Sequence, residues 1–150
     1  MADAPADHVE IAQLLQRYGR AIDERRFADL ERVFAADAEV DYRILDTTTR
    51  GPWREAIGAF PRFLDVFPYT THLISPPVVE LRGDEASADS RLIAVHGWER
   101  LAGGSGAWFV FGVYRDTLVR TTEGWRIRRR ELRALGTQGE LPPRAELRRK

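Results

Sequence analysis

The chain has 150 residues with 23 Lys+Arg and 23 Asp+Glu, so its formal net charge is zero. This length fits a single domain with its own core, and the balanced charge gives no global field that would draw the protein to nucleic acid or to an anionic membrane. The absence of cysteine excludes disulfides, thiolate nucleophiles and thiolate metal sites. We therefore expect a small-molecule or protein partner, and no nucleic-acid or membrane partner.

The ends of the chain differ in composition from its middle. The N-terminal segment lacks the apolar core of a signal peptide, and no apolar run approaches the roughly 20 residues that cross a bilayer. A cytoplasmic location is therefore the default expectation. Residues 1–7 are expected to be disordered, residues 8–135 to form one α+β domain, and residues 136–150, which mix Gly, Pro and charge, to be a flexible tail.

The first half of the chain is predicted to be mainly helical. Asp7 and Glu10 have the spacing of a capping box, and a stripe of apolar residues then recurs at helical intervals. The stripe consists of Ile11, Leu14, Leu15, Tyr18 and Ile22. A short helix over residues 27–34 is predicted to precede a strand over residues 38–45. Gly51-Pro52 indicates the start of a third helix, which Pro61 should kink or end.

The second half of the chain is predicted to be almost entirely extended. Strands are expected at residues 71–81, 86–101, 107–121 and 124–132, with glycine-containing turns between the later ones. Pro76-Pro77 cannot donate ladder hydrogen bonds, so a bulge or a sheet edge is expected there. Consecutive antiparallel strands need no crossover helices, so the predicted class is α+β. We expect a strongly curved, mixed but mainly antiparallel sheet, wrapped around about three N-terminal helices and enclosing a pocket.

Two of the three histidines lie in predicted strands with apolar companions. His96 shares one strand face with Leu92, Ala94 and Trp98, and His72 has the parity of the inward-facing positions in its own strand. One interpretation is a pair of core histidines whose ring nitrogens bond backbone carbonyls. The other is a pair of histidines that face a single cavity.

Asp23 and two tyrosines are further candidates. Asp23 lies at the C-terminal end of the first helix, where the helix dipole disfavours a negative charge, and faces either solvent or the pocket rim. Tyr18 lies on the helix stripe and Tyr42 alternates with apolar residues, so each is either core or a hydroxyl donor in the pocket.

The last predicted strand carries four arginines. Arg129 shares parity with Trp125 and Ile127, so it is a candidate for the pocket mouth, paired there with Glu131 or Asp116. The opposite row, formed by Arg126, Arg128 and Arg130, is predicted to be a solvated face. The scattered histidines lack metal-ligand spacing and no glycine loop for phosphate leads into a helix, so neither metal nor organic cofactor is expected.

Several segments together resemble the scytalone dehydratase-like and SnoaL-like branch of the superfamily of cone-shaped α+β barrels that includes ketosteroid isomerase and nuclear transport factor 2. They are AIDERRFADLERVF, AEVDYR, TTHLIS, AVHGW and GWRI, in that order, within residues 8–134. The resemblance implies a cone-shaped barrel, no cofactor, and a homodimer or homotrimer that covers the outer face of the sheet.

The resemblance also assigns roles to residues. His72 in TTHLIS matches the catalytic base, Asp23 the aspartate that orients it, His96 a second pocket histidine, and Tyr42 a tyrosine that polarises the substrate carbonyl. The tyrosine that precedes the aspartate in scytalone dehydratases is Ile22 here, so Tyr18 is expected to take its place, as in related bile-acid dehydratases. Scytalone itself is therefore not expected to be the substrate.

These assignments predict elimination of water from a polycyclic, polyketide-like or steroid-like β-hydroxy carbonyl compound. Candidate walls of the hydrophobic substrate site are aromatic; they are Phe34, Trp53, Phe60, Phe63, Trp108 and Phe111. A polyketide cyclase or a ketosteroid-type isomerase would use the same histidine and aspartate. The contrasting alternative is a noncatalytic module, such as the small subunit of a ring-hydroxylating dioxygenase, which predicts a closed cavity and an exposed apolar sheet face.

Overall fold

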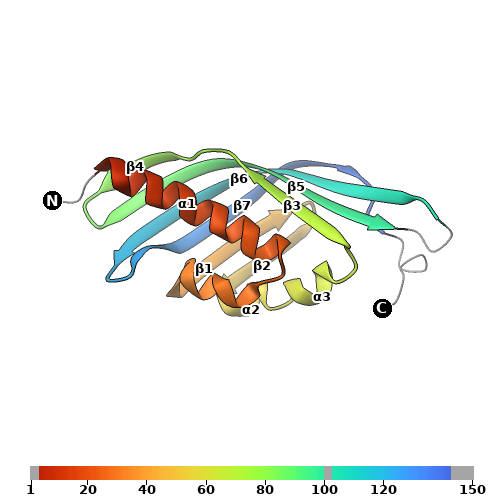
Figure 1. Cartoon of the computed structure of the whole chain (residues 1–150), viewed down its shortest axis with the longest axis horizontal. Coiled ribbons are helices and arrows are strands. Elements are labelled where there is room, and N and C mark those ends of the chain that lie inside the picture. The colour runs from red at the N-terminus through yellow and green to blue at the C-terminus, as the bar shows by residue number, and fades with distance from the viewer. Residues whose placement is uncertain (1–3, 100–102, 143–150) are drawn as a thin grey trace.

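The computed structural model describes residues 4–99 and 103–142, which form four helical segments and seven strands (Figure 1). The helical segments are α1 (Ala4–Asp23), the 3-10 helix η1 (Phe27–Arg32), α2 (Trp53–Ile57) and α3 (Phe60–Leu64). The strands are β1 (Phe34–Ile44), β2 (Thr47–Pro52), β3 (Tyr69–Ile74), β4 (Val78–Arg82), β5 (Glu85–Glu99), β6 (Ser105–Thr121) and β7 (Gly124–Gly139).

All seven strands belong to one sheet with the order β2-β1-β7-β6-β5-β3, and β4 also pairs with β5. Every pair is antiparallel except β1 with β7, which is parallel. The predicted α+β class with a mixed, mainly antiparallel sheet is therefore confirmed. The sheet is not closed into a barrel, because β2 forms one edge and the short strands β3 and β4, which both pair with β5, form the other. Helix α1 lies along the sheet, and α2 and α3 lie near the β1 and β2 edge (Figure 1).

Helix α1 buries the predicted stripe, whose five side chains are each at most 1% exposed. Its start differs from the prediction, because residues 4–7 of the expected disordered segment already belong to the helix. The Asp7 carboxylate accepts hydrogen bonds from the guanidinium of Arg120 at 2.6 and 2.7 Å and from the indole of Trp125 at 3.0 Å. Glu10 accepts one from the backbone N–H of Trp125. The predicted capping box is wrong, since both acids bind strands β6 and β7 instead.

The region between β1 and β3 differs most from the prediction. Strand β2 was not expected, because its sequence TTTRGP carries no apolar alternation; it is an edge strand that pairs only with β1. Pro52 precedes α2 with extended dihedrals rather than occupying its first turn. Pro61 does not kink a long helix: it lies in the first turn of α3, where the missing N–H costs nothing, and thereby separates α2 from α3.

The prolines between β3 and β4 act as expected. Pro76 and Pro77 lie outside both strands, and the two short strands on either side pair with β5 one after the other. At the other end of the chain, β7 runs to Gly139, so residues 136–139 of the expected tail are a strand. The indole of Trp98 donates to the carbonyl of Glu140 at 2.9 Å. Residues 143–150 of the expected tail lie outside the described part.

Strand β7 changes face in its middle. Ile127 pairs with Leu118 of β6, and the preceding β6 residue pairs with Arg129, so Arg128 is an extra residue that forms a β-bulge. The bulge reverses the alternation. Arg130, predicted to be solvated, is therefore fully buried, and Arg129, predicted to face inward, lies on the outer face.

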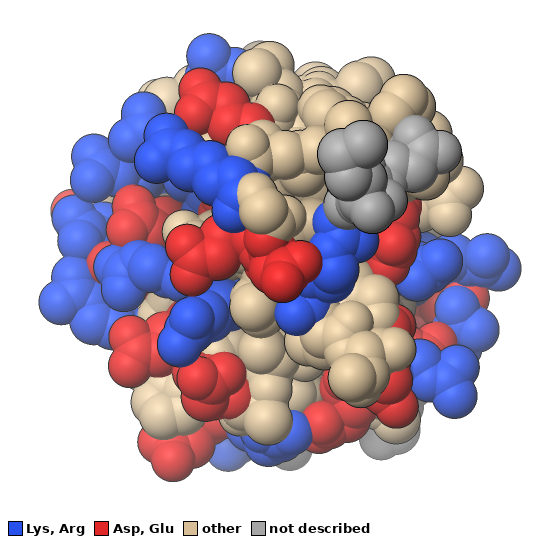
Figure 2. All heavy atoms as spheres, turned by 90° about the vertical axis from the view of Figure 1, so that its left-hand side faces the viewer, with Lys and Arg blue, Asp and Glu red and all other residues tan. Residues whose placement is uncertain are grey.

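Charged side chains cover much of the surface. Figure 2 shows the end of the molecule where α1 begins, and there basic and acidic side chains are interspersed. In the described ranges, no helix is both long and apolar enough to cross a membrane.

Candidate active site

A cavity of about 110 Å³ lies between α1, α3 and the inner face of the sheet. Its lining consists of Tyr18, Ile22, Tyr42, Ile44, Phe60, Phe63, Leu64, His72, Leu92, Ala94, His96, Trp108, Val110, Tyr114 and Leu132. Most of these side chains are apolar. The groups able to act as acids, bases or hydroxyl donors are two histidines, which come from β3 and β5, and three tyrosines, which come from α1, β1 and β6.

Asp23 and His72 are in direct contact. Nδ1 of His72 lies 2.7 Å from Oδ1 of Asp23, and the backbone N–H of His72 donates to Oδ2 at 2.7 Å. The hydroxyl of Thr70 donates to Oδ1 at 3.0 Å. These donors offset the unfavourable dipole at the end of α1. Burial raises the pKa of Asp23, but the hydrogen bonds and charge of His72 outweigh that effect and leave it lowered.

The aspartate fixes the tautomer of the imidazole. An ionised carboxylate only accepts hydrogen bonds, so the hydrogen of neutral His72 resides on Nδ1, and Nε2 keeps its lone pair. Gly19 allows α1 to pack closely against β3 at His72, because a Cβ at position 19 would lie only 3.1 Å from Cβ of His72. The sequence interpretation missed Gly19, although an isolated glycine inside an amphipathic helix is itself a signal of close packing.

His96 lies beside His72, with the two ring centroids 6.2 Å apart. Its ring packs against Phe67 and Trp108, each at a centroid distance of 5.1 Å. Within the described residues, its Nδ1 is buried without a hydrogen-bond partner. Burial, and then the charge of His72, lower the pKa of His96 from 6.5 to about 4. His96 is therefore neutral near neutral pH, and the expectation that both histidines face one cavity agrees with these positions.

The tyrosines form a cluster that adjoins the histidines, since the ring of Tyr18 packs edge-on against that of His72 with the centroids 6.4 Å apart. The hydroxyls of Tyr18 and Tyr42 are 2.9 Å apart, and the ring of Tyr114 packs edge-on against Tyr18. Burial raises the pKa of all three phenols, while the charge of Arg130 acts in the opposite direction. All three are therefore neutral at physiological pH and able to donate hydrogen bonds.

A buried ion pair supports this cluster. The guanidinium of Arg130 binds both carboxylate oxygens of Asp116 at 2.8 Å and lies 4.2 Å from the ring centroid of Tyr18 and 4.1 Å from that of Tyr114. Both charged side chains are 0% exposed. Burial lowers the pKa of Arg130, but the charge of Asp116 outweighs that effect and leaves the pKa raised, so the guanidinium stays charged. The alternation along β6 was a signal that Tyr114 and Asp116 face inward. The inward direction of Arg130 could not be predicted in the same way, because the bulge in β7 reverses the alternation.

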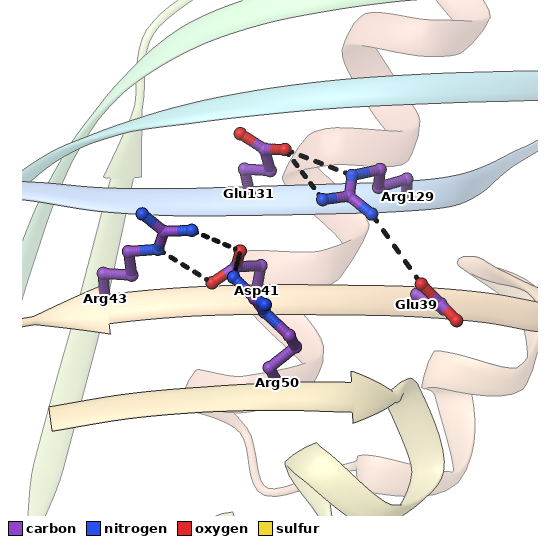
Figure 3. A network of polar contacts seen from close by, with 6 residues as sticks. All are labelled: Glu39, Asp41, Arg43, Arg50, Arg129 and Glu131. Atoms are coloured by element: carbon purple, nitrogen blue, oxygen red, sulfur yellow. Dashed lines mark hydrogen bonds and ion pairs between the residues drawn. The ribbon is translucent and has the colours of Figure 1, made fainter.

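Two predicted substrate-binding residues lie away from the cavity. Trp53 stacks on Phe34 in the core with a centroid distance of 5.1 Å. Arg129 faces the opposite side of the sheet, where it binds Glu131 at 3.0 Å and Glu39 at 3.7 Å (Figure 3).

Among the other predicted aromatic walls, Phe60, Phe63 and Trp108 line the cavity. Phe111 does not, because its position in β6 alternates with the buried inward-facing ones, and it stacks on Phe109 instead. In the part of the chain that is described, no group of three or more His, Asp or Glu side chains is arranged to hold a metal ion.

Comparison with known proteins agrees with this architecture. The SnoaL-like domain family matches residues 4–131. The chain is 39% identical over 125 residues to the uncharacterized protein Rv2910c of Mycobacterium tuberculosis, covering 83% of each. Its fold is similar to that of the Kfla4162 protein from Kribbella flavida, with a TM-score of 0.81, 27% identity and coverage of 91% and 95%. It is also similar to a putative scytalone dehydratase from Novosphingobium aromaticivorans, with a TM-score of 0.74, 23% identity and coverage of 93% and 91%.

Proposed function

Because the chain belongs to the SnoaL-like domain family, we propose that it is a cofactor-independent lyase that removes water from a neutral cyclic β-hydroxy ketone. The observation that carries this proposal is the contact between Asp23 and His72 at the wall of an apolar cavity. The likeness in fold to a putative scytalone dehydratase is consistent with it. The cavity volume of about 110 Å³ favours a substrate that places one small ring inside.

His72 is the base in this mechanism. Nε2 takes a proton from the carbon next to the ketone, and the electrons of that C–H bond form the enolate double bond while the ketone oxygen becomes negative. Histidine suits this step because its neutral form is a base near physiological pH. Asp23 holds the ring by its Nδ1–H and stabilises the imidazolium that forms. The carboxylate is thus a positioning and electrostatic group.

The tyrosine hydroxyls stabilise the enolate. Tyr18 and Tyr42 are neutral, and their mutual hydrogen bond and packing fix their positions. That bond uses one of the two hydroxyl hydrogens, so one hydroxyl of the pair donates to the enolate oxygen and the other supports it. A donor of this kind contributes roughly 3–4 kcal/mol to the stabilisation of a developing oxyanion. The cavity excludes bulk water around them, which strengthens each interaction.

The elimination step returns the proton. The enolate re-forms the ketone, the new double bond forms between the α and β carbons, and the β carbon–oxygen bond breaks. The imidazolium of His72 gives its proton to the departing hydroxyl, so one water leaves and the enzyme is restored. His96 is neutral, so its role is to hold the hydroxyl by a hydrogen bond rather than to supply the proton.

The alternative reactions diverge after the first proton transfer. A polyketide cyclase would use the enolate to close a ring, and a ketosteroid-type isomerase would return the proton to another carbon. A noncatalytic module would use the outer sheet face, where Leu73 is 58% and Ile93 38% exposed. The same face is where a homodimer or homotrimer, which stays a prediction, would form.

The test compares two identical substitutions. His72→Gln keeps an amide that can bond Asp23 but removes the basic lone pair, whereas His8→Gln alters a histidine that bonds only its own helix. Both variants and the wild type are assayed with β-hydroxycyclohexanone and with its benzo-fused analogue β-hydroxytetralone, whose dehydration products are followed by absorbance.

We expect His72→Gln to lose about 10³-fold in kcat/KM while its melting temperature stays within about 4 °C of the wild type. His8→Gln should match the wild type in both. Full activity in His72→Gln would contradict the assignment of the base.

A further inference from the structure

Arg25 has more polar contacts than its place after a helix requires. It is the second residue after α1 and has a left-handed backbone conformation, with φ of 59°, which is uncommon for a residue other than glycine. Its Nη1 donates to the carbonyl of Ile22 at 2.9 Å and to that of Asp23 at 3.2 Å. Its side chain therefore turns back over the end of the helix that carries Asp23.

The same guanidinium reaches two other elements. Nη1 also donates to Oγ1 of Thr70 in β3 at 2.8 Å. Nη2 donates to the carbonyls of Leu64 and Phe67 at 3.2 and 3.0 Å. Leu64 ends α3, the helix that forms one wall of the cavity. The Arg25 side chain thus joins the C-terminal end of α1, which carries Asp23, to the start of β3 and to the helix α3 at the wall of the cavity.

The contact with Thr70 has a direction. A guanidinium only donates, so Oγ1 of Thr70 must accept from Arg25. A hydroxyl has a single hydrogen, and that hydrogen then points to Oδ1 of Asp23 at 3.0 Å. The same oxygen accepts from Nδ1 of His72. The hydrogen bonds therefore form one chain from Arg25 through Thr70 and Asp23 to His72.

We propose that Arg25 is a positioning residue: through Thr70 it fixes the rotamer of the Asp23 carboxylate, and through the carbonyls after α3 it holds that carboxylate in register with the cavity wall. This inference rests on the proposed role of His72. Arg25 does not line the cavity, so it acts on the reaction without contacting the substrate. Lysine cannot replace it, because one ammonium cannot span Thr70 and the α3 carbonyls with a rigid fork.

The primary experiment needs no substrate. Imidazole nitrogen NMR reports which nitrogen of neutral His72 carries the hydrogen, and the chain has only three histidines, so His8→Gln and His96→Gln assign the spectrum. The variants are Arg25→Met, Arg25→Lys, Thr70→Val, Thr70→Ser and the double variant Arg25→Met/Thr70→Val. Arg54→Met is the matched control, because Arg54 also bridges an acid and a backbone carbonyl but lies away from the cavity.

Arg25→Met and Thr70→Val should each raise the Nε2–H fraction of His72 about tenfold, the change expected for loss of one charge-assisted hydrogen bond. Arg25→Lys should resemble Arg25→Met, Thr70→Ser should resemble the wild type, and the double variant should be no worse than either single one. Arg54→Met should leave the tautomer unchanged. An unchanged tautomer in folded Arg25→Met or Arg25→Lys, or additive effects in the double variant, would overturn the proposal.

A kinetic arm separates this inference from the proposed function. With β-hydroxytetralone, Arg25→Met should lower kcat about tenfold with KM changed about twofold or less, since the substrate does not contact the guanidinium. If His72→Gln proves as active as the wild type while Arg25→Met shifts the tautomer, the proposed function fails and the positioning role stands. If His72→Gln is inactive and Arg25→Met changes neither tautomer nor kcat, the positioning role fails alone.

Discussion

An aspartate makes close polar contacts on each side of the sheet, but the partners of the two aspartates differ in exposure. On the outer face, Asp41 binds Arg43 and Arg50 at 2.9 Å (Figure 3). On the inner side, Asp23 binds His72 at a similar distance of 2.7 Å. The outer arginines are 46% and 63% exposed, whereas the His72 side chain is 9% exposed. Bond length alone therefore says little about what a pair does; the surroundings decide.

The surroundings act through solvation. Water competes for the arginines of the outer network, although Asp41 itself is 4% exposed, and a pair that is exposed on both sides, such as Arg129 with Glu39, contributes about 0–1 kcal/mol to stability. Inside, removing one partner leaves the other without a replacement, which costs about 1–3 kcal/mol for a neutral group and more for a charge. Substitutions on the two sides should therefore differ in size, and the expected order can be tested.

The largest effect is expected for Asp23→Asn. The amide can donate to Nδ1, which favours the tautomer with hydrogen on Nε2 and removes the basic lone pair from the cavity. We expect kcat/KM for β-hydroxytetralone to fall about 10³- to 10⁴-fold. Asp37→Asn is the matched control, since Asp37 is exposed and 3.8 Å from Arg128 on the surface. Equal activity of the two variants would remove the distinction between the two sides.

The next effect concerns the buried ion pair. Asp116→Ala leaves the guanidinium of Arg130 unpaired where it is 0% exposed, so the free energy of unfolding should fall by about 3–5 kcal/mol. Replacing both partners, as Asp116→Leu with Arg130→Met, should recover most of that loss. Urea denaturation measures both. A loss below about 1 kcal/mol in Asp116→Ala would mean that burial does not set the size of the effect.

The pH dependence of stability should isolate His96. Its pKa is lowered from 6.5 to about 4, so as pH falls between these values the unfolded chain takes up a proton that the folded protein does not. The stability of the folded protein is complete above the upper value and decreases toward the lower one. His96→Gln lacks this loss, which is on the order of 3 kcal/mol.

The measurement is urea denaturation of the wild type and His96→Gln at about pH 7 and about pH 4.5. Carboxylates titrate alike in both proteins. The two proteins should therefore differ in how much free energy of unfolding they lose between these pH values, and that difference reports His96. An equal loss of unfolding free energy in the two proteins would show that the His96 ring is solvated in the folded state.

The smallest effect is expected on the outer face. Arg129→Ala removes contacts with Glu131 and Glu39, but the arginine is 47% exposed. The free energy of unfolding should change by less than about 1 kcal/mol, and kcat/KM should not change. Added salt should reduce even that difference. A clear loss of activity would restore Arg129 to the candidate site from which its position excludes it.

The sequence predicted features that depend on local periodicity. The stripe of α1 and the inward face that His96 shares with Trp98 follow from periods of 3.6 and 2, and both are buried as expected. The contact of Asp23 with His72 joins residues 49 positions apart, so no local pattern contains it. It was expected only because the resemblance supplied a tertiary template.

The errors have a common physical origin. A bulge at Arg128 inserts one residue and reverses the side chains that follow it in β7, up to a second irregularity at Leu135, and the sequence RIRRREL gives no signal of it. Strand β2 is stabilised by pairing with β1 rather than by its own side chains, so its polar sequence gave no signal. Trp53 was predicted to line the substrate site but lies in the core. An aromatic residue beside a pocket and one in the core have the same local sequence pattern, so the sequence could not separate the two.

Deuterium exchange into cyclohexanone tests the central claim most directly, because this ketone has no hydroxyl to lose and reports proton abstraction alone. The wild type in deuterium oxide should exchange the hydrogens next to the carbonyl faster than buffer, and His72→Gln should reduce the rate to that of buffer. Enzyme-catalysed exchange at equal rates in the two proteins would contradict the account, because a different group would then be the base.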